Sequence, residues 1–459
     1  MTRAAPLGGL AVIAFAAGAV WSTEPGRAER QLVTRYVTAW TQGDYQKMYS
    51  LLDAGSRQGT SEAQFVSELK AAADTATLDS LTTVRVGRRS GGAIPVRMRV
   101  GTKLWGVLSE TLEVPLSGSG SGASVRLSGT LLFPGLAAGE RLTRRVTLPP
   151  RATLLASDGT PLAQGPDRTS PIPDVAEQIV GELGPIPSAA KAQFAIAGYP
   201  PNARVGIDGL EQIFQSRLAG TPGGTLLAGR RVLASASPVA APAVKTTVDP
   251  AIESATVSAM AGRYAGMAVM NPHTGAVLAL AGIADSSLQP PGSTMKIITT
   301  TGALAAGIVK PTTTFPIQTS ATIDGFQLQN AGGEACGGTL VNAFAVSCNS
   351  VFAPLGVTLG ARRLVNIAER FGFNQPPSIP GTAESTIPSA STIGDSLAVG
   401  SSAIGQGMVQ SSALGMTDVA ATIAMAGRRP ILTLVAHQRP RFVRVSSRRV
   451  AREDRKSVG

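Results

Sequence analysis

The sequence predicts a multidomain α+β protein: an N-terminal membrane helix, then a small α+β domain, a β-rich domain and an α/β domain. Its 459 residues allow about three folded domains, and 43% of them are hydrophobic. Apolar residues at helical spacing come first in the sequence, and an alternation of apolar and polar residues that is typical of strands follows. We expect boundaries that give residues 1–24 as a membrane anchor or signal segment, 25–147 as the α+β domain, 148–244 as the β-rich domain and 245–459 as the α/β domain.

The N-terminal segment predicts export. Arg3 precedes an apolar run from Ala4 to Trp21, which as a helix would span about 27 Å, close to the hydrocarbon thickness of a bilayer. The run is either an uncleaved anchor or a signal peptide that is cleaved near residues 17–19. Both alternatives place the bulk of the chain outside the cytoplasm, and we expect it at the cell membrane.

The composition excludes two kinds of site. Much of the net charge of +12 comes from arginines in the last thirty or so residues, and aromatic residues make up only 4% of the chain. Because base stacking needs aromatic side chains, we expect no nucleic-acid partner. With only two cysteines and two histidines, we expect no metal and no cofactor.

Residues 25–147 carry helix signals before strand signals. Apolar side chains recur at helical spacing over 27–75, with a break at Gly43-Asp44 and a capping pair at Ser61 and Gln64. Four alternating stretches then predict an antiparallel sheet. They are Thr82–Arg88, Ile94–Leu104, Glu110–Leu116 and Val125–Phe133. We expect no catalytic cluster in this domain.

Residues 148–244 contain turn signals and glycine-rich segments. Asp158-Gly159 is a preferred two-residue hairpin turn. The segments Val205–Glu211 and Leu218–Gly224 follow later. We expect the hairpin and these segments to pack together in a β-rich domain of their own.

The last part of the chain contains a candidate nucleophile. Asp249-Pro250 is typical of a helix start, and a hairpin is expected over Met267–Leu280. The breakers at 290–292 then lead into a buried helix, so Ser293 lies near a helix N-terminus, where N–H groups favour developing negative charge. Lys296 follows one turn later on the same face.

The spacing of Ser293 and Lys296 predicts an activated serine. A serine hydroxyl needs a base to take its proton, and a lysine among apolar groups has a lowered pKa and can be that base. The two histidines, His273 and His437, have no evident Ser-His-Asp context. Ser347-Cys348-Asn349 lies about fifty residues further along, and its hydroxyl and amide can enter the same cleft. Ser-x-x-Lys and a serine–asparagine motif are part of the signature of β-lactamases and penicillin-binding proteins.

From about residue 151 onward, the chain resembles a class B penicillin-binding protein, a membrane-anchored D,D-transpeptidase that cross-links peptidoglycan. The segments that carry the resemblance are Thr246–Ala281, Pro290–Thr300, Ala343–Ala353, Ala403–Gly407 and Leu414–Ala420. Residues 148–244 resemble the dimerisation region of this class. The preceding α+β domain resembles the NTF2-like domain of the MecA type.

The resemblance implies roles for individual residues. Ser293 would be acylated, Lys296 would be its base, Ser347 would relay a proton, Asn349 would position the donor peptide, and Gln406 and Gly407 would contact substrate in a Gly-Gln-Gly loop. The implied partners are peptidoglycan stem peptides that end in D-Ala-D-Ala, β-lactam antibiotics, the membrane and other cell-wall synthesis proteins.

One motif of the family is missing. No Lys-Thr-Gly or Lys-Ser-Gly occurs after Asn349, and Arg441–Gly459 is polar and basic. We therefore expect an incomplete, β-lactamase-like transpeptidase domain from a truncated or frameshifted copy, or a genuine inactive homologue. Either would be a poor catalyst, because the oxyanion would lose one N–H donor. The alternatives are a non-catalytic cell-wall or division scaffold, and a β-lactamase-like hydrolase or D,D-carboxypeptidase.

The two cysteines, Cys336 and Cys348, are candidates for a disulfide. Export would place both in an oxidising compartment, where such bridges form. The glycines around Cys336 allow the chain to reach back. Two buried free thiols are the alternative.

Overall fold

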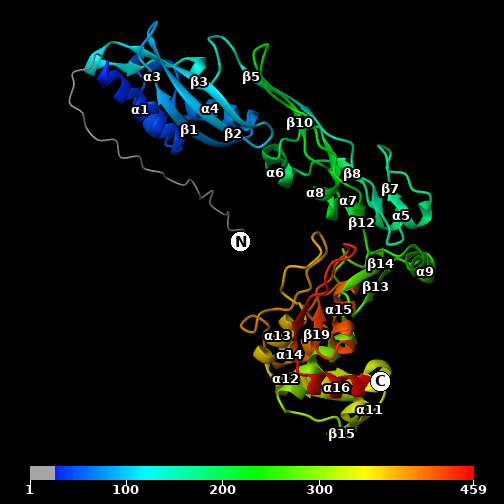
Figure 1. Ribbon diagram of the computed structural model, residues 1–459. Helices are drawn as coiled ribbons and strands as arrows, with labels where there is room; N and C mark the ends of the chain where they lie inside the picture. The colour runs from blue at the N-terminus through cyan, green and yellow to red at the C-terminus, as the bar shows by residue number, and fades with distance from the viewer. Residues whose placement is uncertain (1–25, 459) are drawn as a thin grey trace. The chain divides into compact units, whose positions relative to one another are not determined.

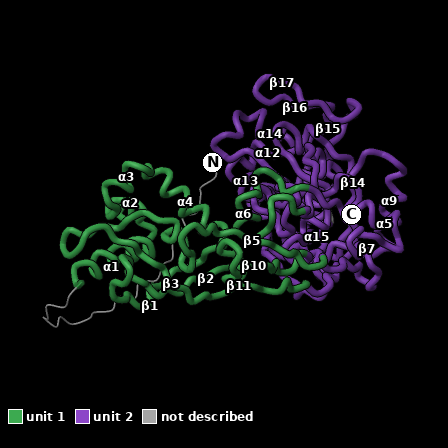
Figure 2. Tube along the Cα trace, turned by 90° about the horizontal axis from the view of Figure 1, so that it is seen from above, with its two compact units in different colours: residues 1–150, 185–203, 219–240 green, residues 151–184, 204–218, 241–459 purple. Residues whose placement is uncertain are grey.

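The structure, a computed structural model, describes residues 26–458 and contains two compact units (Figure 2). Unit 1 comprises residues 1–150, 185–203 and 219–240, and unit 2 comprises residues 151–184, 204–218 and 241–459. The membrane segment expected over Ala4–Trp21 lies outside the described residues. Within residues 26–458, no helix combines the length and the apolar character needed to cross a bilayer.

Unit 1 begins with helices that pack on an antiparallel sheet, as the sequence predicts (Figure 1). The helices are α1 (Arg27–Thr41), α2 (Tyr45–Ser50), α3 (Ala54–Gly59) and α4 (Glu62–Thr75). The strands are β1 (Leu78–Val86), β2 (Ala93–Thr102), β3 (Gly106–Ser117) and β4 (Ser124–Val125), paired in that order. Tyr36, Phe65, Met98 and Leu112 are fully buried in the core between the two layers.

A second sheet in unit 1 joins distant parts of the sequence. Its strands are β5 (Leu142–Thr147), β10 (Gly223–Ala228) and β11 (Arg231–Ala236), in the order β11–β10–β5. Leu226 of β10 belongs to the same core as Tyr36. The indole N–H of Trp105 donates to the carbonyl of Gly224 at 3.1 Å and so links the two sheets. Unit 1 also contains the short helix α6 (Lys191–Ile196).

One of the four expected strands is wrong. Val125–Phe133 contains only the end of β4, and a 3-10 turn follows at Gly129–Leu131. Ser128 accepts a hydrogen bond from the backbone N–H of Thr130 and caps this turn. Leu131 and Phe133 are nevertheless buried, because the turn directs both into the core. The alternating apolar residues here are buried on one side of a turn, and the backbone is not an extended strand.

Unit 2 begins with the predicted hairpin and short elements around it. The hairpin strands are β6 (Leu154–Leu155) and β7 (Pro161–Ala163), which turn at Asp158-Gly159, and β12 (Val244–Lys245) pairs with β6. The neighbouring elements are α5 (Pro173–Ile179), β8 (Leu183–Pro185), β9 (Arg204–Gly206), α7 (Gly209–Ile213) and α8 (Gln215–Leu218). Gly159 has φ +97°, a conformation that the turn requires and that glycine adopts freely.

A buried carboxylate, Glu211 of α7, connects these short elements. Its Oε2 accepts from Arg151 Nε at 2.5 Å, and its Oε1 lies 2.6 Å from Arg168 Nη2. Arg151 also donates to the backbone carbonyl of Glu211 at 2.9 Å. Because both carboxylate oxygens are paired, the charge is tolerated at 0% exposure.

The region 148–244 is divided between the two units. Its strands β10 and β11 lie in unit 1, whereas the hairpin and residues 204–218 lie in unit 2. Leu154 and Leu210 share one core with Val277 and Leu414 of the following region. This differs from the separate β-rich domain that we expected. Strands of two or three residues bury too little apolar surface to form a core alone.

The rest of unit 2 is built on a hairpin, β13 (Gly266–Asn271) and β14 (Ala276–Gly282). Helices α9 (Pro250–Met260) and α15 (Ala413–Ala424) both pack against this hairpin. Residues 431–435 lie along β14, where Thr433 forms a bridge to Ala276. In the described part of the chain, β13 has β14 as its only partner strand.

Further helices and strand pairs complete unit 2. The helices are α10 (Lys296–Ala305), α11 (Leu340–Ala345), α12 (Asn349–Leu359), α13 (Ala361–Arg370), α14 (Ser396–Ala403) and α16 (Arg448–Val458). The antiparallel pairs are β15 (Thr314–Gln318) with β18 (Cys336–Thr339), β16 (Ser320–Ile323) with β17 (Phe326–Gln329), and β19 (Arg428–Pro430) with β20 (Phe442–Arg444).

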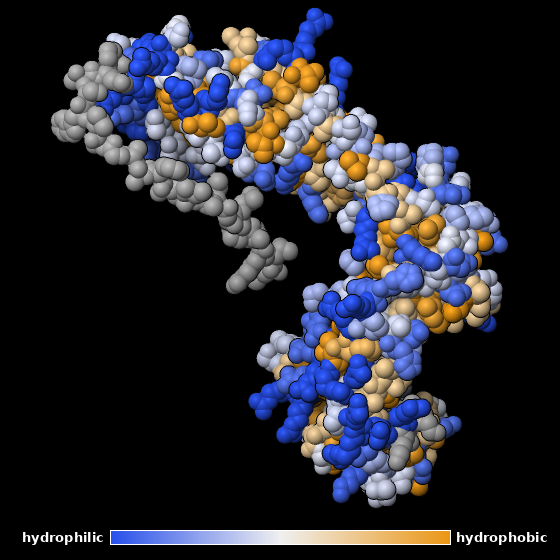
Figure 3. Space-filling model, in the orientation of Figure 1, coloured by the Kyte–Doolittle hydropathy of each residue, from blue (hydrophilic) through white to orange (hydrophobic). Residues whose placement is uncertain are grey.

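The polar, basic segment Arg441–Gly459 contains a strand and a helix that the sequence did not predict. Helix α16 packs against α10 and α11, and Figure 1 shows it near α11. It buries Val450 and Asp454, and the Asp454 carboxylate accepts a hydrogen bond from Thr301 of α10. Its arginines remain exposed, and hydrophilic side chains cover this part of the surface (Figure 3).

Candidate active site

Ser293 lies in a tight turn at the start of α10. Residues Gly292–Met295 form a 3-10 turn that continues into the helix at Lys296. The backbone N–H of Gly292 donates to the carbonyl of Gly405 at 2.9 Å. A Cβ on Gly405 would lie 2.0 Å from the carbonyl oxygen of Gly292, so only glycine permits this approach. The turn leaves Ser293 exposed to solvent.

Lys296 is the centre of the constellation. Its side chain is 1% exposed, and its Nζ lies 3.1 Å from Ser293 Oγ, 2.9 Å from Ser347 Oγ and 2.8 Å from Asn349 Oδ1. It also donates to the backbone carbonyl of Ser347 at 2.7 Å. The four residues predicted from two separate motifs therefore converge on one nitrogen.

The number of acceptors around Nζ suggests how a proton can move. An ammonium has three hydrogens to donate, but four oxygens lie within hydrogen-bond distance of this nitrogen. The neutral amine has two hydrogens and one lone pair. It can therefore donate to the Ser347 carbonyl and to Asn349 while it accepts the hydroxyl proton of Ser293 or Ser347. This arrangement suits a base that activates one serine and exchanges its proton with another.

The backbone of Ser347 is held in an uncommon conformation. Its φ is +60°, in the left-handed region, two residues before α12 begins at Asn349. Such a conformation persists only where surrounding contacts fix it. Asn349 Nδ2 donates to the carbonyl of Gln329 at 3.0 Å, and the N–H of Ser350 donates to Asn330 Oδ1 at 2.8 Å. These contacts hold the turn against the segment that contains β15–β18.

Asn330 is a supporting residue that sequence reasoning missed. It is 5% exposed, and its Nδ2 donates to the carbonyls of Gln318 and Glu334 at 2.8 and 2.9 Å. The NH2 group of the Asn330 side chain therefore donates to the surrounding loop, and its oxygen accepts from Ser350 of α12. Within the sequence it stands in an ordinary turn, Asn-Ala-Gly-Gly. Only its burial distinguishes it from other turn asparagines.

The structure contains a disulfide between Cys336 and Cys348, with a Cα–Cα distance of 5.8 Å. Cys348 is fully buried and stands between Ser347 and Asn349, whereas Cys336 belongs to β18. The disulfide therefore joins the serine–asparagine turn covalently to the strand pair β15–β18.

In the structure of residues 26–458, Gln406 and Gly407 are not part of the hydrogen-bond network around Lys296. They follow Gly405, which contacts Gly292, and both are exposed. Within the part of the chain that the structure describes, neither residue forms a hydrogen bond with Ser293, Lys296, Ser347 or Asn349.

Comparison with known proteins assigns the domains. Residues 265–454 match the family described as the penicillin binding protein transpeptidase domain. Residues 147–231 match the penicillin-binding protein dimerisation domain, and residues 28–140 match the NTF2-like N-terminal transpeptidase domain. The matched families are domains of penicillin-binding transpeptidases. This confirms the family resemblance and the α+β domain composition that the sequence predicts.

Named relatives agree with this family. The peptidoglycan D,D-transpeptidase PbpA of Mycobacterium tuberculosis is 41% identical over 162 residues, which is 32% of this chain and 31% of that protein. The D,D-transpeptidase MrdA of Salmonella typhimurium is 24% identical over 221 residues, 39% of this chain and 36% of that protein. The chain therefore spans about a third of the length of the curated relatives that it matches.

Solved structures show the same fold. The D,D-transpeptidase domain of a peptidoglycan glycosyltransferase from Eggerthella lenta aligns with a TM-score of 0.53 at 26% identity, covering 67% of this chain and 80% of that one. The imipenem acyl-enzyme complex of penicillin-binding protein A from M. tuberculosis aligns with a TM-score of 0.52 at 25% identity, covering 66% and 80%.

The environment of Lys296 changes the pKa of its side chain. Burial lowers the pKa of the Lys296 ammonium from 10.5 to about 8. The ring of Phe352 lies 5.6 Å from Nζ and forms part of the enclosure. An amine with this pKa is partly neutral near physiological pH, which is the state that can accept a proton.

Reduction of the disulfide is expected to destabilise unit 2. The bridge closes a loop of 12 residues, and the chain-entropy model gives about 3 kcal/mol for such a loop. Urea unfolding of the full chain with and without dithiothreitol measures this loss. The variant Cys336→Ala is the control, because it should be destabilised already and show no further response to dithiothreitol. An equal response of both proteins would contradict a stabilising bridge.

Proposed function

We propose that the chain is a serine D,D-transpeptidase that cross-links peptidoglycan stem peptides through an acyl-serine intermediate. The observation that carries this proposal is the position of Lys296 Nζ, 3.1 Å from Ser293 Oγ and 2.9 Å from Ser347 Oγ. A buried amine between two hydroxyls can deprotonate one serine and return the proton through the other. The names of the matched relatives support the same reaction.

In the first half of the proposed reaction, Ser293 Oγ attacks the carbonyl carbon between the two D-alanines of a stem peptide. The hydroxyl proton moves to the neutral amine of Lys296. The C–N bond then breaks, and the leaving amine takes a proton through Ser347, so that free D-alanine departs. The Asn349 amide orients the donor peptide, and the N–H of Ser293 donates to the oxyanion.

In the second half, an amine of a neighbouring stem peptide attacks the acyl-serine carbonyl. Its proton passes to Lys296, and the ester bond to Ser293 breaks with return of a proton to Oγ. The product is a new amide bond, and the enzyme returns to its starting state. Gln406 and Gly407 contribute to substrate binding at the exposed side of the turn.

The proposed setting is the outer face of the cell membrane. Stem peptides lie outside the cytoplasm, and the run Ala4–Trp21 supplies an N-terminal anchor for the domains that follow. β-Lactams would acylate the same serine, and other cell-wall synthesis proteins are further proposed partners.

A synthetic D-Ala-D-Ala donor peptide tests the reaction. Purified full-length protein is incubated with the donor and an acceptor amine, and released D-alanine and amide product are measured. A transpeptidase forms the new amide in proportion to acceptor concentration, whereas a D,D-carboxypeptidase releases D-alanine with hydrolysis only. Ser293→Ala should abolish both products. Hydrolysis without any amide, or activity that survives in Ser293→Ala, would contradict the proposal.

A non-catalytic cell-wall scaffold is the second candidate. It is favoured by one observation: no Lys-Thr-Gly or Lys-Ser-Gly follows Asn349 in these 459 residues. A folded protein that takes up no fluorescent penicillin would support the scaffold, whereas covalent labelling would support the enzyme.

Acylation is expected to rise with pH between 7 and 9. Because the pKa of Lys296 is about 8, about a tenth of the amine is neutral at pH 7 and about nine-tenths at pH 9. The rate constant of acylation by penicillin should therefore increase up to about tenfold and level off above pH 9. Stopped-flow measurements across this range test the profile. A rate that is constant or that falls with pH would exclude the neutral amine as the base.

A further inference from the structure

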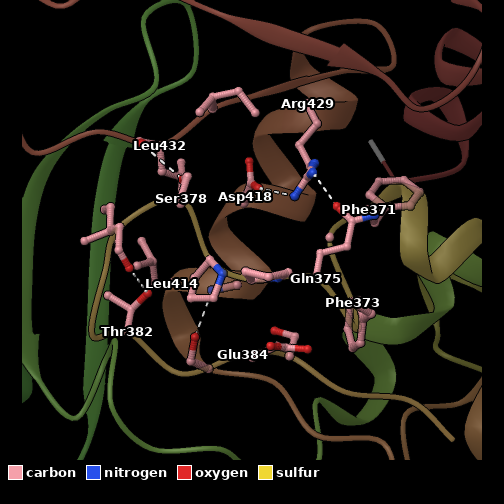
Figure 4. Close-up of a pocket in the computed structure, with 18 of the residues that line it drawn as sticks. Phe371, Phe373, Gln375, Ser378, Thr382, Glu384, Leu414, Asp418, Arg429 and Leu432 are labelled. Carbon is pink, nitrogen blue, oxygen red and sulfur yellow. Dashed lines mark hydrogen bonds and ion pairs between the residues drawn. The ribbon is translucent and has the colours of Figure 1, made fainter. Parts of the chain in front are cut away.

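A second polar site lies in unit 2, apart from the residues around Ser293 (Figure 4). It is a cavity of about 310 Å³ formed by the loop 371–385, by α15 and by residues 429–432. None of the residues proposed for catalysis lines it. The cavity is therefore distinct from the proposed catalytic residues.

Two opposite charges lie next to each other in the wall of this cavity. Asp418 projects from α15, and Arg429 projects from β19 (Figure 4). Asp418 Oδ2 lies 3.7 Å from Arg429 Nη1, which is beyond hydrogen-bond distance. The side chain of Asp418 is only 9% exposed, and that of Arg429 only 15%. Among the residues that the structure describes, Asp418 Oδ1 and Arg429 Nε have no hydrogen-bond partner.

Another buried pair in the same unit shows what a closed ion pair looks like. Glu211 approaches Arg151 to 2.5 Å and Arg168 to 2.6 Å, and both of its carboxylate oxygens are used. Buried charges are costly unless they are paired and hydrogen-bonded in this way. Asp418 and Arg429 meet that requirement only in part. Because the two side chains are not hydrogen-bonded to each other, both can still bind a third group, and that group would carry a positive and a negative charge.

The other walls of the cavity define what such a group would look like. Phe371, Phe373 and Leu414 are buried apolar residues that line it. Its neutral polar side chains already have partners: Ser378 donates to the carbonyl of Leu432 at 3.1 Å, and Gln375 accepts from Arg429 at 3.1 Å. The groups with unused hydrogen-bonding capacity are therefore the carboxylate of Asp418 and the guanidinium of Arg429, which lie beside an apolar surface.

We propose that this cavity binds a small zwitterionic α-amino acid with an apolar side chain. The ammonium would face Asp418, the carboxylate would face Arg429, and the side chain would lie against Phe371 and Phe373. A volume of about 310 Å³ is at the small end of ligand pockets, which suits a single amino acid. The exposed carboxylate of Glu384, which also lines the cavity, disfavours ligands with net negative charge.

The titration of Asp418 is consistent with this geometry. Burial raises the pKa of its carboxyl to about 7, and the nearby Arg429 lowers that pKa only in part. An arriving ammonium would stabilise the charged carboxylate, as opposite charges at close range do.

Isothermal titration of the full chain tests the proposal with four probes: L-leucine, D-leucine, isopentylamine and 4-methylpentanoate. At least one leucine enantiomer should bind, and the amine-only and acid-only probes should bind at least about tenfold more weakly, because each lacks one charge-assisted contact. Glu334→Gln removes an exposed acid elsewhere in unit 2 and should bind like the wild type.

Two variants locate the binding. Asp418→Asn removes the acid, and Ala383→Trp fills the cavity from its loop side without altering either charge; both should lose binding by at least about tenfold. If Asp418→Asn fails to fold, the binding measured with Ala383→Trp alone tests the proposal. Absence of leucine binding to the wild type, or binding that survives in a folded Ala383→Trp protein, would overturn the proposal and leave a structural ion pair beside a water-filled gap.

Discussion

Replacement of Lys296 by methionine is expected to lower the rate constant of acylation by penicillin about 10⁴-fold, the upper range for loss of a positioned general base. Methionine has a similar length and no charge, so it can occupy the same buried space. It cannot accept the Ser293 proton, and it leaves Ser347 and Asn349 without their shared donor. Stopped-flow fluorescence with a labelled penicillin measures the effect.

Lys310→Met is the matched control. Lys310 is exposed and lies beyond the end of α10, so its replacement should leave the acylation rate unchanged. Circular dichroism of both variants shows whether they are folded. A folded Lys296→Met protein that acylates within tenfold of the wild type would mean that another group removes the serine proton.

Replacement of Glu211 by alanine is expected to destabilise unit 2 by about 3–5 kcal/mol, the usual cost of breaking a buried ion pair from one side. The variant would leave the guanidinium groups of Arg151 and Arg168 without the carboxylate that they share. Because α7, the hairpin segment and the loop at Arg168 meet at this carboxylate, the loss should affect the whole region. Urea unfolding of the full chain measures the change.

Glu177→Ala provides the control for this prediction. Glu177 lies on neighbouring α5 and is exposed, so its removal should change stability by less than about 0.5 kcal/mol. Equal stability of the two variants would show that the Glu211 cluster does not stabilise the fold.

The candidate site could be predicted from the sequence because its motifs are local. Ser293 and Lys296 are one helical turn apart, and Ser347 and Asn349 flank a single residue, so each pair has its geometry set by a few backbone angles. That the two pairs meet at one amine followed only from the family resemblance. The left-handed φ of Ser347 and the bridging role of Asn330 could not be predicted, because both depend on contacts with the distant segment 314–339.

The errors in the fold have equally specific causes. The alternation over Val125–Phe133 predicts a strand, but Gly129 begins a turn that buries the same side chains. Helix α16 was not predicted because most of its residues are charged, and its buried side contains few apolar residues, including Val450. The division of residues 148–244 between two units depends on core contacts of Leu154 and Leu226 that no local pattern reveals.

In the proposed reaction, Ser293 forms a covalent acyl intermediate with Lys296 as its base. Peptide mapping by mass spectrometry after incubation with penicillin tests it most directly. We expect a single penicilloyl adduct on the peptide that contains Ser293, present in the wild type and absent from Ser293→Ala. An adduct on another residue, or folded wild-type protein that carries none, would contradict it.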